Sequence, residues 1–402
     1  MKIGFIRETK TPEDNRVALI PSQIKELQRQ YSNVEFCVQS SINRSYKDEE
    51  YQALGIVVKD DVSDCDILFG IKEADISTLL PGKYYFFFGH IAKMQAYNKP
   101  LLQKMMSLGI TFSDYEYLVD DKGERVCAFG WWAGVVGMYN TLRAYGLKYN
   151  LFKLEKPNKE FTLDILLKRL CTLKLPAIKI VLTGKGRVSH GARYVLNKMG
   201  IQELTVDEYL KHDMDEACFC VAGIEQLVKR RDNTPFDRYD FKMNPHLYLS
   251  DFERFYKVSD VLVSCHFWSP EQPVYLNEID LTDVSNKIKV IGDITCDIQG
   301  SIKSTLRAST HDEPFYDYNP HTGKEEKAFS NKDGNITVMA VDTCPNALAI
   351  DTSRYFGEML SEHIFPSLLR GELETPLISR ATILKEGKIT NQYSYLREYA
   401  ES

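Results

Sequence analysis

Charged side chains follow two apolar runs in the first hundred residues. Lys72 and Glu73 come directly after DILFGI, and His90 follows YYFFFG. Ligands collect at the carboxyl ends of strands in open parallel sheets. A lysine that is partly desolvated there has its pKa lowered toward the range of a general base, and a histidine shuttles protons near neutral pH. The pattern therefore predicts an acid/base pair, Lys72 and His90.

The same residues have a simpler interpretation. Lys72 paired with Glu73 is also typical of a solvated helix start, and His90 of an ordinary loop histidine. Arg16 in EDNRVALIP, Glu116 in SDYEYL and Arg125 in DDKGERVCAFG are, one by one, equally compatible with surface charges. Position along the chain alone does not decide between these interpretations.

A glycine-containing turn lies in IVLTGKGRVSHGARYVLNKMG, residues 180 to 200. In a dinucleotide fold the first glycine permits a tight turn, and the second lets the backbone approach a pyrophosphate at the positive end of a helix. Gly184 and Gly186 fit these two places. The third place, where a small residue lets helix and strand pack, is occupied by Ser189, so the fingerprint is imperfect.

In such folds an acidic residue about 20 positions further on accepts hydrogen bonds from the ribose hydroxyls of the dinucleotide. Asp207 lies 21 residues beyond Gly186, which favours NAD. Arg187 and Lys185 would instead suit a 2′-phosphate, so NADP stays open. The alternative for the whole stretch is a strand-to-helix turn that binds no ligand.

Short apolar runs alternate with helical patterns in the first hundred residues and again after residue 175, which predicts two parallel sheets. We expect an α/β protein with two Rossmann-like parallel-sheet domains and a cleft between them. Residues 1–133 plus 345–402 form the predicted substrate domain, and residues 134–344 the dinucleotide-binding domain. Residues 317–335 have the composition of an exposed loop.

Composition narrows the class of protein. The chain has 402 residues, 44% of them hydrophobic, a net charge of -6 and no long basic run, which argues against nucleic-acid binding. AFGWWAGVVGMY is too short to cross a bilayer and predicts a buried helix. Nine irregularly spaced cysteines predict neither a metal site nor a disulfide framework. With no apolar signal-peptide core at the N-terminus, we expect a cytoplasmic protein without membrane contacts.

Taken in order, several motifs resemble the alanine dehydrogenase and transhydrogenase superfamily: KIGFIRETKTPEDNRVALIP, GIKE, a histidine after an apolar strand, the glycine turn and GDITCDIQGS. Within it, HIAKMQ, DYEYLVDDKGERVCAFGWWAG and EPFYDYNP resemble lysine-forming saccharopine dehydrogenase. The strongest likeness is to the lysine-ketoglutarate reductase half of bifunctional lysine-degrading enzymes. The likeness spans nearly the whole chain.

The resemblance implies reversible oxidation of saccharopine to L-lysine and 2-oxoglutarate with a nicotinamide cofactor, NAD or alternatively NADP. It implies that Lys72 takes the proton from the secondary amine. His90 would act as acid and base in water addition and carbinolamine breakdown. Glu73 and Glu116 would tune these two residues.

The resemblance also implies binding residues. Arg16, Lys93 and Arg125 would meet the carboxylates of the substrate, and Asp297 in CDIQG would lie beside the nicotinamide ribose. Arginine suits this task because its planar group binds a carboxylate through two hydrogen bonds.

Two alternatives stay open. An alanine-type amino-acid dehydrogenase shares Arg16, Lys72, His90 and Asp297, although the stretch RVCAFGWWAG argues for the saccharopine branch. A catalytically silent relative that only binds a dinucleotide would have no need of both Lys72 and His90. With 402 residues we expect the lysine-side reaction alone, without a second dehydrogenase half.

Overall fold

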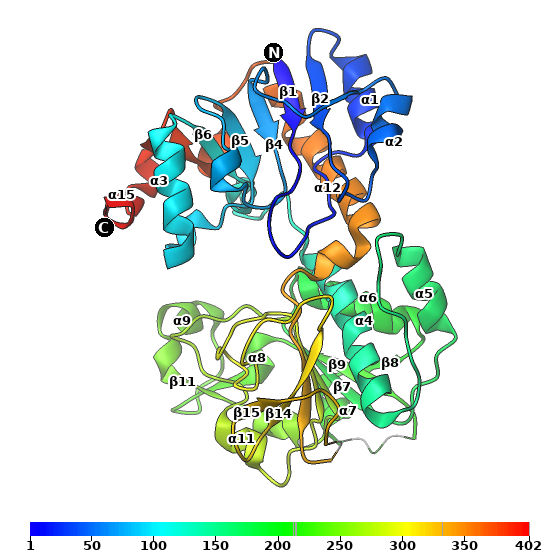
Figure 1. The fold of residues 1–402 in the computed structure, drawn as a ribbon. Helices are drawn as coiled ribbons and strands as arrows, with labels where there is room; N and C mark the ends of the chain where they lie inside the picture. Colours follow the sequence, from blue (N-terminus) through cyan, green and yellow to red (C-terminus); the bar gives the residue numbers. More distant parts are fainter. Residues whose placement is uncertain (212, 214, 332, 402) are drawn as a thin grey trace. The chain divides into compact units, whose positions relative to one another are not determined.

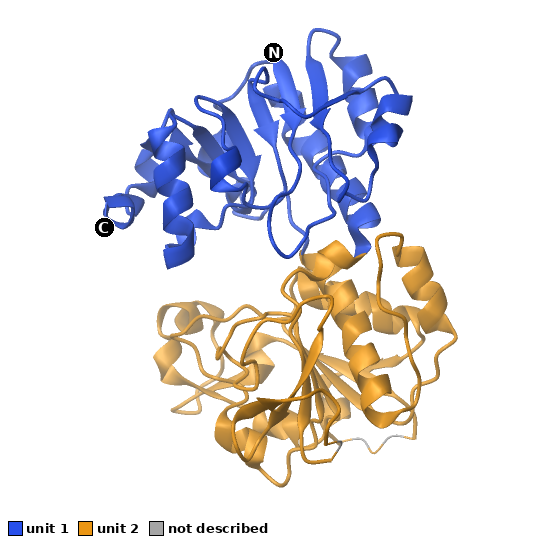
Figure 2. Ribbon diagram, viewed as in Figure 1, with its two compact units in different colours: residues 1–129, 348–402 blue, residues 130–347 orange. Residues whose placement is uncertain are grey.

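Two α/β units make up the chain in the computed structural model, which describes residues 1–211, 213, 215–331 and 333–401. Unit 1 comprises residues 1–129 and 348–402, and unit 2 comprises residues 130–347 (Figure 2). Each unit has its own eight-stranded sheet, in blue-to-cyan and red segments for unit 1 and in green-to-orange segments for unit 2 (Figure 1). Each unit is described separately below.

The sheet of unit 1 has the strand order β18-β17-β6-β5-β4-β1-β2-β3. Neighbours from β6 to β3 run parallel, whereas β17 is antiparallel to β6 and to β18. The strands are β1 (Lys2–Phe5), β2 (Glu35–Gln39), β3 (Val57–Lys59), β4 (Ile67–Phe69), β5 (Tyr84–Phe87), β6 (Thr111–Asp114), β17 (Thr382–Lys385) and β18 (Lys388–Ile389). All residues of β4 and β5 are buried, as expected for central strands covered on both faces.

Helices from both ends of the chain cover this sheet. They are α1 (Pro21–Gln30), α2 (Asp48–Ala53), α3 (Lys99–Ser107), α12 (Ala349–His363), α13 (Phe365–Leu368), α14 (Pro376–Ala381) and α15 (Leu396–Glu401). The ring of Phe365 on α13 lies 5.0 Å from that of Phe69 on β4 and 6.3 Å from that of Phe5 on β1. The C-terminal segment therefore contributes to the core of unit 1.

The sheet of unit 2 has the order β15-β14-β16-β13-β12-β7-β9-β8. Its strands are β7 (Lys179–Thr183), β8 (Gln202–Leu204), β9 (Cys218–Ala222), β12 (Val261–Ser264), β13 (Val290–Asp293), β14 (Phe315–Asn319), β15 (Lys324–Glu326) and β16 (Ile336–Met339). A separate hairpin pairs β10 (Val228–Arg230) with β11 (Tyr248–Ser250). From β7 the chain proceeds to β8 and β9 on one side and then to β12 on the other. The point between β7 and β12 is therefore a topological switch point, where ligands bind in such sheets.

The helices of unit 2 are α4 (Gly130–Tyr149), α5 (Leu163–Cys171), α6 (Arg187–Lys198), α7 (Val206–Lys211), α8 (Ile224–Leu227), α9 (Arg238–Met243), α10 (Glu253–Tyr256) and α11 (Glu278–Thr282). Glycines let α4 and α6 approach closely: a Cβ at Gly134 would lie 1.8 Å from Val188 O, and one at Gly191 would lie 1.9 Å from Trp131 O. Among the described residues, no helix combines the length and the apolar character needed to span a membrane.

The predicted α/β fold with two sheets is confirmed, but each sheet is mixed rather than wholly parallel. The hairpin β17–β18 turns at Glu386 and Gly387, whose φ angles of 49° and 77° are those of a tight two-residue turn. The prediction of an exposed loop at residues 317–335 is wrong in part. This stretch contains the end of β14 and all of β15, which pair as a hairpin. Its turn residue Gly323 has φ 66°.

Candidate functional site

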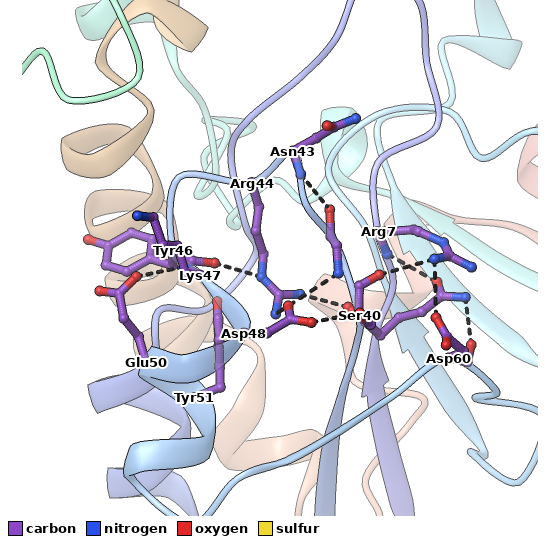
Figure 3. Close-up of polar contacts among 12 residues, drawn as sticks. Arg7, Ser40, Asn43, Arg44, Tyr46, Lys47, Asp48, Glu50, Tyr51 and Asp60 are labelled. Atoms are coloured by element: carbon purple, nitrogen blue, oxygen red, sulfur yellow. Dashed lines mark hydrogen bonds and ion pairs between the residues drawn. The ribbon is translucent and has the colours of Figure 1, made fainter.

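A polar network around Arg44 holds the loop between β2 and α2 (Figure 3). The Arg44 guanidinium donates to Gln39 O at 2.7 Å, forms an ion pair with Asp48 and stacks on the ring of Tyr51. Arg7, which follows β1, donates to Ser40 O at 3.2 Å (Figure 3). The network holds the start of the segment that carries Arg16 against the end of β2.

Arg16 is buried in a two-point ion pair. Its Nε and Nη2 donate to the two carboxylate oxygens of Asp14 at 2.9 and 2.5 Å, and both side chains are 3% exposed. The guanidinium also lies 4.3 Å from the centre of the Phe129 ring. Burial by itself would raise the pKa of Asp14, but the charge of Arg16, assisted by Lys72, lowers it. The structure thus places Arg16 and Lys72 near the same carboxylate.

His90 and Glu73 lie side by side at the ends of β5 and β4. His90 Nδ1 is 2.7 Å from Glu73 Oε1, and Lys10 Nζ is 2.8 Å from Glu73 Oε2. Burial would raise the pKa of Glu73, but His90 and Lys10 outweigh it and lower this pKa to about 2. Glu73 is therefore a carboxylate throughout the neutral range, and it accepts hydrogen bonds from both partners when His90 carries a proton on Nδ1.

The backbone at His90 is held in an unusual conformation. Its φ of 51° lies in the left-handed region, which is costly for a residue with a side chain. The backbone N–H groups of Gly89 and His90 both donate to Asp114 Oδ2, at 3.1 and 3.0 Å. Burial raises the pKa of Asp114 to about 6. Asp114, at the end of β6, thus fixes the direction in which His90 leaves β5.

Glu116 joins Lys93 and Arg125 in a second ion cluster. Arg125 Nη2 and Lys93 Nζ lie 2.6 and 3.3 Å from Glu116 Oε1. Glu116 Oε2 is buried without a hydrogen-bond partner among the described residues. Burial would raise the pKa of Glu116, but Arg125, Lys93 and His90 together lower it. The Glu116 carboxylate therefore stays charged, and it interacts electrostatically with His90.

These groups share one edge of the sheet. Arg16 follows β1, Lys72 and Glu73 follow β4, His90 follows β5, and Glu116 follows β6. These four strands are consecutive neighbours, so their carboxyl ends meet. The predicted catalytic and carboxylate-binding residues are thus brought together, although their chemical roles stay predictions.

The glycine turn in unit 2 connects β7 to α6. Gly184 has φ 83°, and a Cβ there would lie 2.8 Å from His266 Cα. Gly186 is the N-cap of α6 and has open space where a Cβ would be, and Arg187 is the first residue of that helix. Ser189 is fully buried, consistent with a small residue between helix and strand. The open space beside Gly186 thus lies at the start of a helix of 12 residues, a position where phosphate groups bind in dinucleotide folds.

Asp207 lies three residues after the end of β8, as His90 does after β5. It is exposed in the first turn of α7, and β9 separates β8 from β7. Asp207 nevertheless lines a hollow of about 360 Å³ together with Lys185, Glu203 and Arg254. The hollow is next to the glycine turn, so a dinucleotide there would still be near Asp207.

Two residues near the turn were missed from the sequence. Glu225, in α8 after β9, forms an ion pair with Lys185 of the turn. His266, after β12, is buried: Nδ1 lies 2.7 Å from Thr183 Oγ1, and Nε2 lies 2.7 Å from Ser301 Oγ. Burial lowers the pKa of His266 to about 3, so the ring is neutral. An apolar strand followed by a charged or imidazole residue was the signal that pointed to Lys72 and His90, and it also fits these two.

Asp297 lies in the loop after β13, which is the neighbour of β12. Its charge helps to raise the pKa of Asp293, for which burial is the main cause, to about 6. Ser301, four residues further along, is tied through His266 to Thr183. The loop that carries Asp297 is thereby linked to the end of β7, where the glycine turn begins. Among the described residues, no cluster of metal-ligating side chains is present.

Comparison with known proteins places this geometry in context. Residues 4–136 match the family model described as alanine dehydrogenase/PNT, N-terminal domain. The chain is 28% identical over 445 residues to alpha-aminoadipic semialdehyde synthase of Arabidopsis thaliana, covering all of this chain but 42% of that protein. The chain thus spans less than half the length of that relative.

Two further comparisons cover both partners almost completely. The chain is 26% identical over 396 residues to saccharopine dehydrogenase [NAD(+), L-lysine-forming] of Emericella nidulans, covering 92% of each. A solved structure of L-alanine dehydrogenase superimposes with a TM-score of 0.63 at 14% identity and 99% coverage of each chain, which shows a shared fold. The predicted resemblance is confirmed: the chain is similar to lysine-forming saccharopine dehydrogenases over most of its length, and it shares the fold of alanine dehydrogenase.

Proposed function

We propose that this chain is an oxidoreductase that interconverts saccharopine with L-lysine and 2-oxoglutarate, using NAD in preference to NADP. The observation that carries the proposal is the set of charged groups at the carboxyl ends of β1, β4, β5 and β6, above all the 2.7 Å contact between His90 and Glu73. The homologues that cover the whole chain support the same reaction class.

In this proposal Lys72 and His90 move the protons. Lys72 takes a proton from the secondary amine of saccharopine, and loss of a hydride from the carbon next to the nitrogen, which a bound nicotinamide would accept, leaves an iminium. His90 then activates water for addition to the iminium and donates a proton to the leaving amine of lysine. Glu73 and Glu116 are both charged and interact with His90, which lowers the pKa of each carboxyl group. Two proton-transfer groups with different surroundings suit this sequence of steps.

Arg16, Lys93 and Arg125 are the proposed carboxylate ligands. Saccharopine carries several carboxylates, so cations near the proton-transfer groups would orient it. Arg16 forms an ion pair with Asp14, and Lys93 and Arg125 form ion pairs with Glu116. Residues that are already held by such ion pairs lose little conformational freedom when substrate binds.

Unit 2 is the proposed dinucleotide-binding domain, and unit 1 the substrate domain. Gly184 and Gly186 would let backbone approach the pyrophosphate, Arg187 would lie at the same helix start, and Ser189 would allow the close packing of α6. Asp207 would accept hydrogen bonds from the adenosine ribose and repel a 2′-phosphate, and Asp297 would lie beside the nicotinamide ribose. A bound nicotinamide supplies the hydride acceptor.

The expected cytoplasmic location of the protein likewise stays a prediction.

A spectrophotometric assay tests the function. Purified protein is given saccharopine, alanine, or lysine with 2-oxoglutarate, each with NAD(H) and with NADP(H), and nicotinamide absorbance is followed. Turnover of saccharopine and of lysine with 2-oxoglutarate, with NAD(H) preferred, is expected. Turnover of alanine alone would favour an alanine-type dehydrogenase. No turnover, together with measurable dinucleotide binding, would favour a silent relative.

A further inference from the structure

Glu8 connects the segment after β1 to the end of β4. Its Oε1 accepts a hydrogen bond from the backbone N–H of Ile71 at 2.6 Å, and its Oε2 accepts one from the backbone N–H of Lys72 at 2.8 Å. One carboxylate therefore holds two successive amides, and the second belongs to the proposed base. Hydrogen bonds to a charged acceptor are stronger than those between neutral groups.

The chain leaves room for this contact at Gly70, the residue directly after β4. A Cβ at Gly70 would lie 3.4 Å from Glu8 Oε1 and 3.1 Å from Ile6 Cδ1. A side chain there would press on Ile6 and would come into contact with the Glu8 carboxylate. Glycine at position 70 thus leaves space beside Glu8 and the amides that follow.

Glu8 sits where a charge is costly. Burial raises its pKa to about 8, and the nearby charge of Asp14 acts in the same direction. The amides of Ile71 and Lys72 and the charge of Arg16 act against this rise. The pKa of the buried Tyr115 phenol, in η4 (Tyr115–Tyr117), is raised mainly by burial and in part by the charge of Glu8. The charged or titratable side chains that interact electrostatically with Glu8 therefore include Asp14, Arg16 and Tyr115.

We propose that Glu8 is a positioning residue for Lys72, acting by fixing the backbone from which the lysine side chain extends toward the substrate. The inference rests on the proposed function, in which Lys72 is the base. An ionised carboxylate is a stronger acceptor at both oxygens than a protonated carboxyl group, so ionisation of Glu8 strengthens its hold on the amides of Ile71 and Lys72. Activity should accordingly contain a component that rises with pH as Glu8 loses its proton.

Glu8→Gln tests the proposal because glutamine keeps the length but has only one acceptor oxygen, so one of the two amides loses its partner. We expect kcat with saccharopine to fall by about 10- to 100-fold, since an unpaired buried amide costs on this order. The KM for the dinucleotide should stay within about twofold of the wild-type value. The rising component of the pH profile should be absent. Glu8→Asp, which is one methylene shorter, should also lose activity.

The matched control is Glu50→Gln. Glu50 Oε2 also accepts a backbone hydrogen bond, from Lys47 at 2.6 Å, at the start of α2. Glu50 makes the same kind of contact as Glu8 but away from Lys72. Glu50→Gln should therefore retain the wild-type kcat and pH profile. A general loss of kcat in both glutamine variants would overturn the proposal.

A second readout does not depend on turnover. The rate at which an amine-acylating reagent modifies Lys72 is measured by mass spectrometry and normalised to the exposed Lys25 of the same sample. We expect both Glu8 variants to change this rate by about threefold or more and Glu50→Gln to leave it unchanged. If the Gln variant does not fold, Glu8→Asp supplies the comparison.

The two proposals fail in different ways. Unchanged Lys72 modification and unchanged kcat in the Glu8 variants would overturn the role of Glu8 while leaving the reaction intact. Absence of saccharopine turnover in the wild type, with altered Lys72 modification in the Glu8 variants, would overturn the function while supporting the positioning of Lys72.

Discussion

Glu73 accepts a hydrogen bond from Lys10 through one carboxylate oxygen and lies 2.7 Å from His90 Nδ1 through the other. Because Nδ1 is engaged by Glu73, the opposite ring nitrogen, Nε2, is the one left for proton transfer in the proposed reaction. The pair therefore orients the imidazole and sets its tautomer in the same contact. This relationship makes Glu73 the most direct test of how His90 is held.

Glu73→Gln should lower kcat with saccharopine by about 10-fold or more, since the imidazolium formed during the reaction loses its anionic partner. The KM for the dinucleotide should be little affected. Steady-state kinetics over a range of pH checks this. Asp75→Asn is a suitable control, because Asp75 is an exposed residue of the same segment that caps η1 (Ile76–Thr78). Equal losses in the two variants would mean that the whole segment, rather than the contact to His90, had been disturbed.

The stability of the protein in acid should also depend on Glu73. Its pKa is about 2 in the folded chain and has an ordinary value of 4.5, so folding is stabilised by its charge. This stabilisation is fully present above about pH 4.5 and is lost as the pH falls toward 2. Urea unfolding across the acid range should therefore show a weaker pH dependence in Glu73→Gln than in the wild type. Parallel curves would show that the ion pair adds nothing to stability.

Lys72→Met and His90→Gln should each lower kcat by about 10² to 10⁴-fold, the usual contribution of a proton-transfer group. Dinucleotide affinity, measured by quenching of protein fluorescence, should change little. The double variant should lose less than the product of the two single losses, because groups that act as a unit are not additive. Near wild-type kcat and pH profiles in both single variants would mean that these residues are structural charges.

Cofactor choice should depend on Asp207. Replacing it with Asn removes a negative charge beside the hollow near Lys185, so the ratio of kcat/KM for NAD to that for NADP should fall by about tenfold. Glu225→Gln is the informative companion variant, because Glu225 follows the strand next to β7 and contacts Lys185. If Glu225→Gln changed the ratio and Asp207→Asn did not, strand order rather than spacing along the chain would identify the ribose ligand.

Local sequence patterns were sufficient to predict which residues follow the strands. The apolar runs before Lys72 and His90 are β4 and β5, and the apolar run before Gly184 is β7, so these positions followed from the sequence. Parallel strands bring their carboxyl ends to one edge, which is why charged residues far apart in the chain form one cluster. The alternation of strands and helices also predicted the two sheets.

Contacts between residues far apart in the chain could not be predicted from the sequence. Glu8 meets amides more than sixty residues away, and nothing in RETK indicates which strand its carboxylate will reach. The sequence also did not show that β9 lies between β7 and β8, because spacing along the chain does not encode the order of strands. The contacts of His266 likewise come from distant segments, Thr183 at the end of β7 and Ser301 in the loop after β13.

The close contact between α4 and α6 predicts strong sensitivity at Gly134. A Cβ there would lie 1.8 Å from Val188 O and 2.8 Å from Ala192 N, and backbone atoms cannot move aside as a side chain does. Gly134→Ala should therefore lower the Tm by about 10 °C or more, or prevent folding. Gly130→Ala, at the start of the same helix, would place its Cβ 3.4 Å from Arg187 Cβ and should leave the Tm nearly unchanged. Similar melting curves for both variants would show that the helices can separate at little cost.

Lys148 should make the stability of unit 2 increase with pH. This side chain of α4 is fully buried and donates from Nζ to Asn335 O at 2.8 Å and to Thr337 Oγ1 at 3.1 Å. Burial lowers its pKa from 10.5 to about 8, so between these values the unfolded chain holds a proton that the folded chain has lost. The free energy of unfolding must then rise with pH across this range, by up to ~3 kcal/mol from this group. Urea unfolding of wild type and Lys148→Met between about pH 7 and pH 10 measures the difference, with the exposed Lys25→Met as control. The wild type and the control should share the rise, and Lys148→Met should lack it; equal slopes in all three would mean that Lys148 keeps its proton in the folded chain.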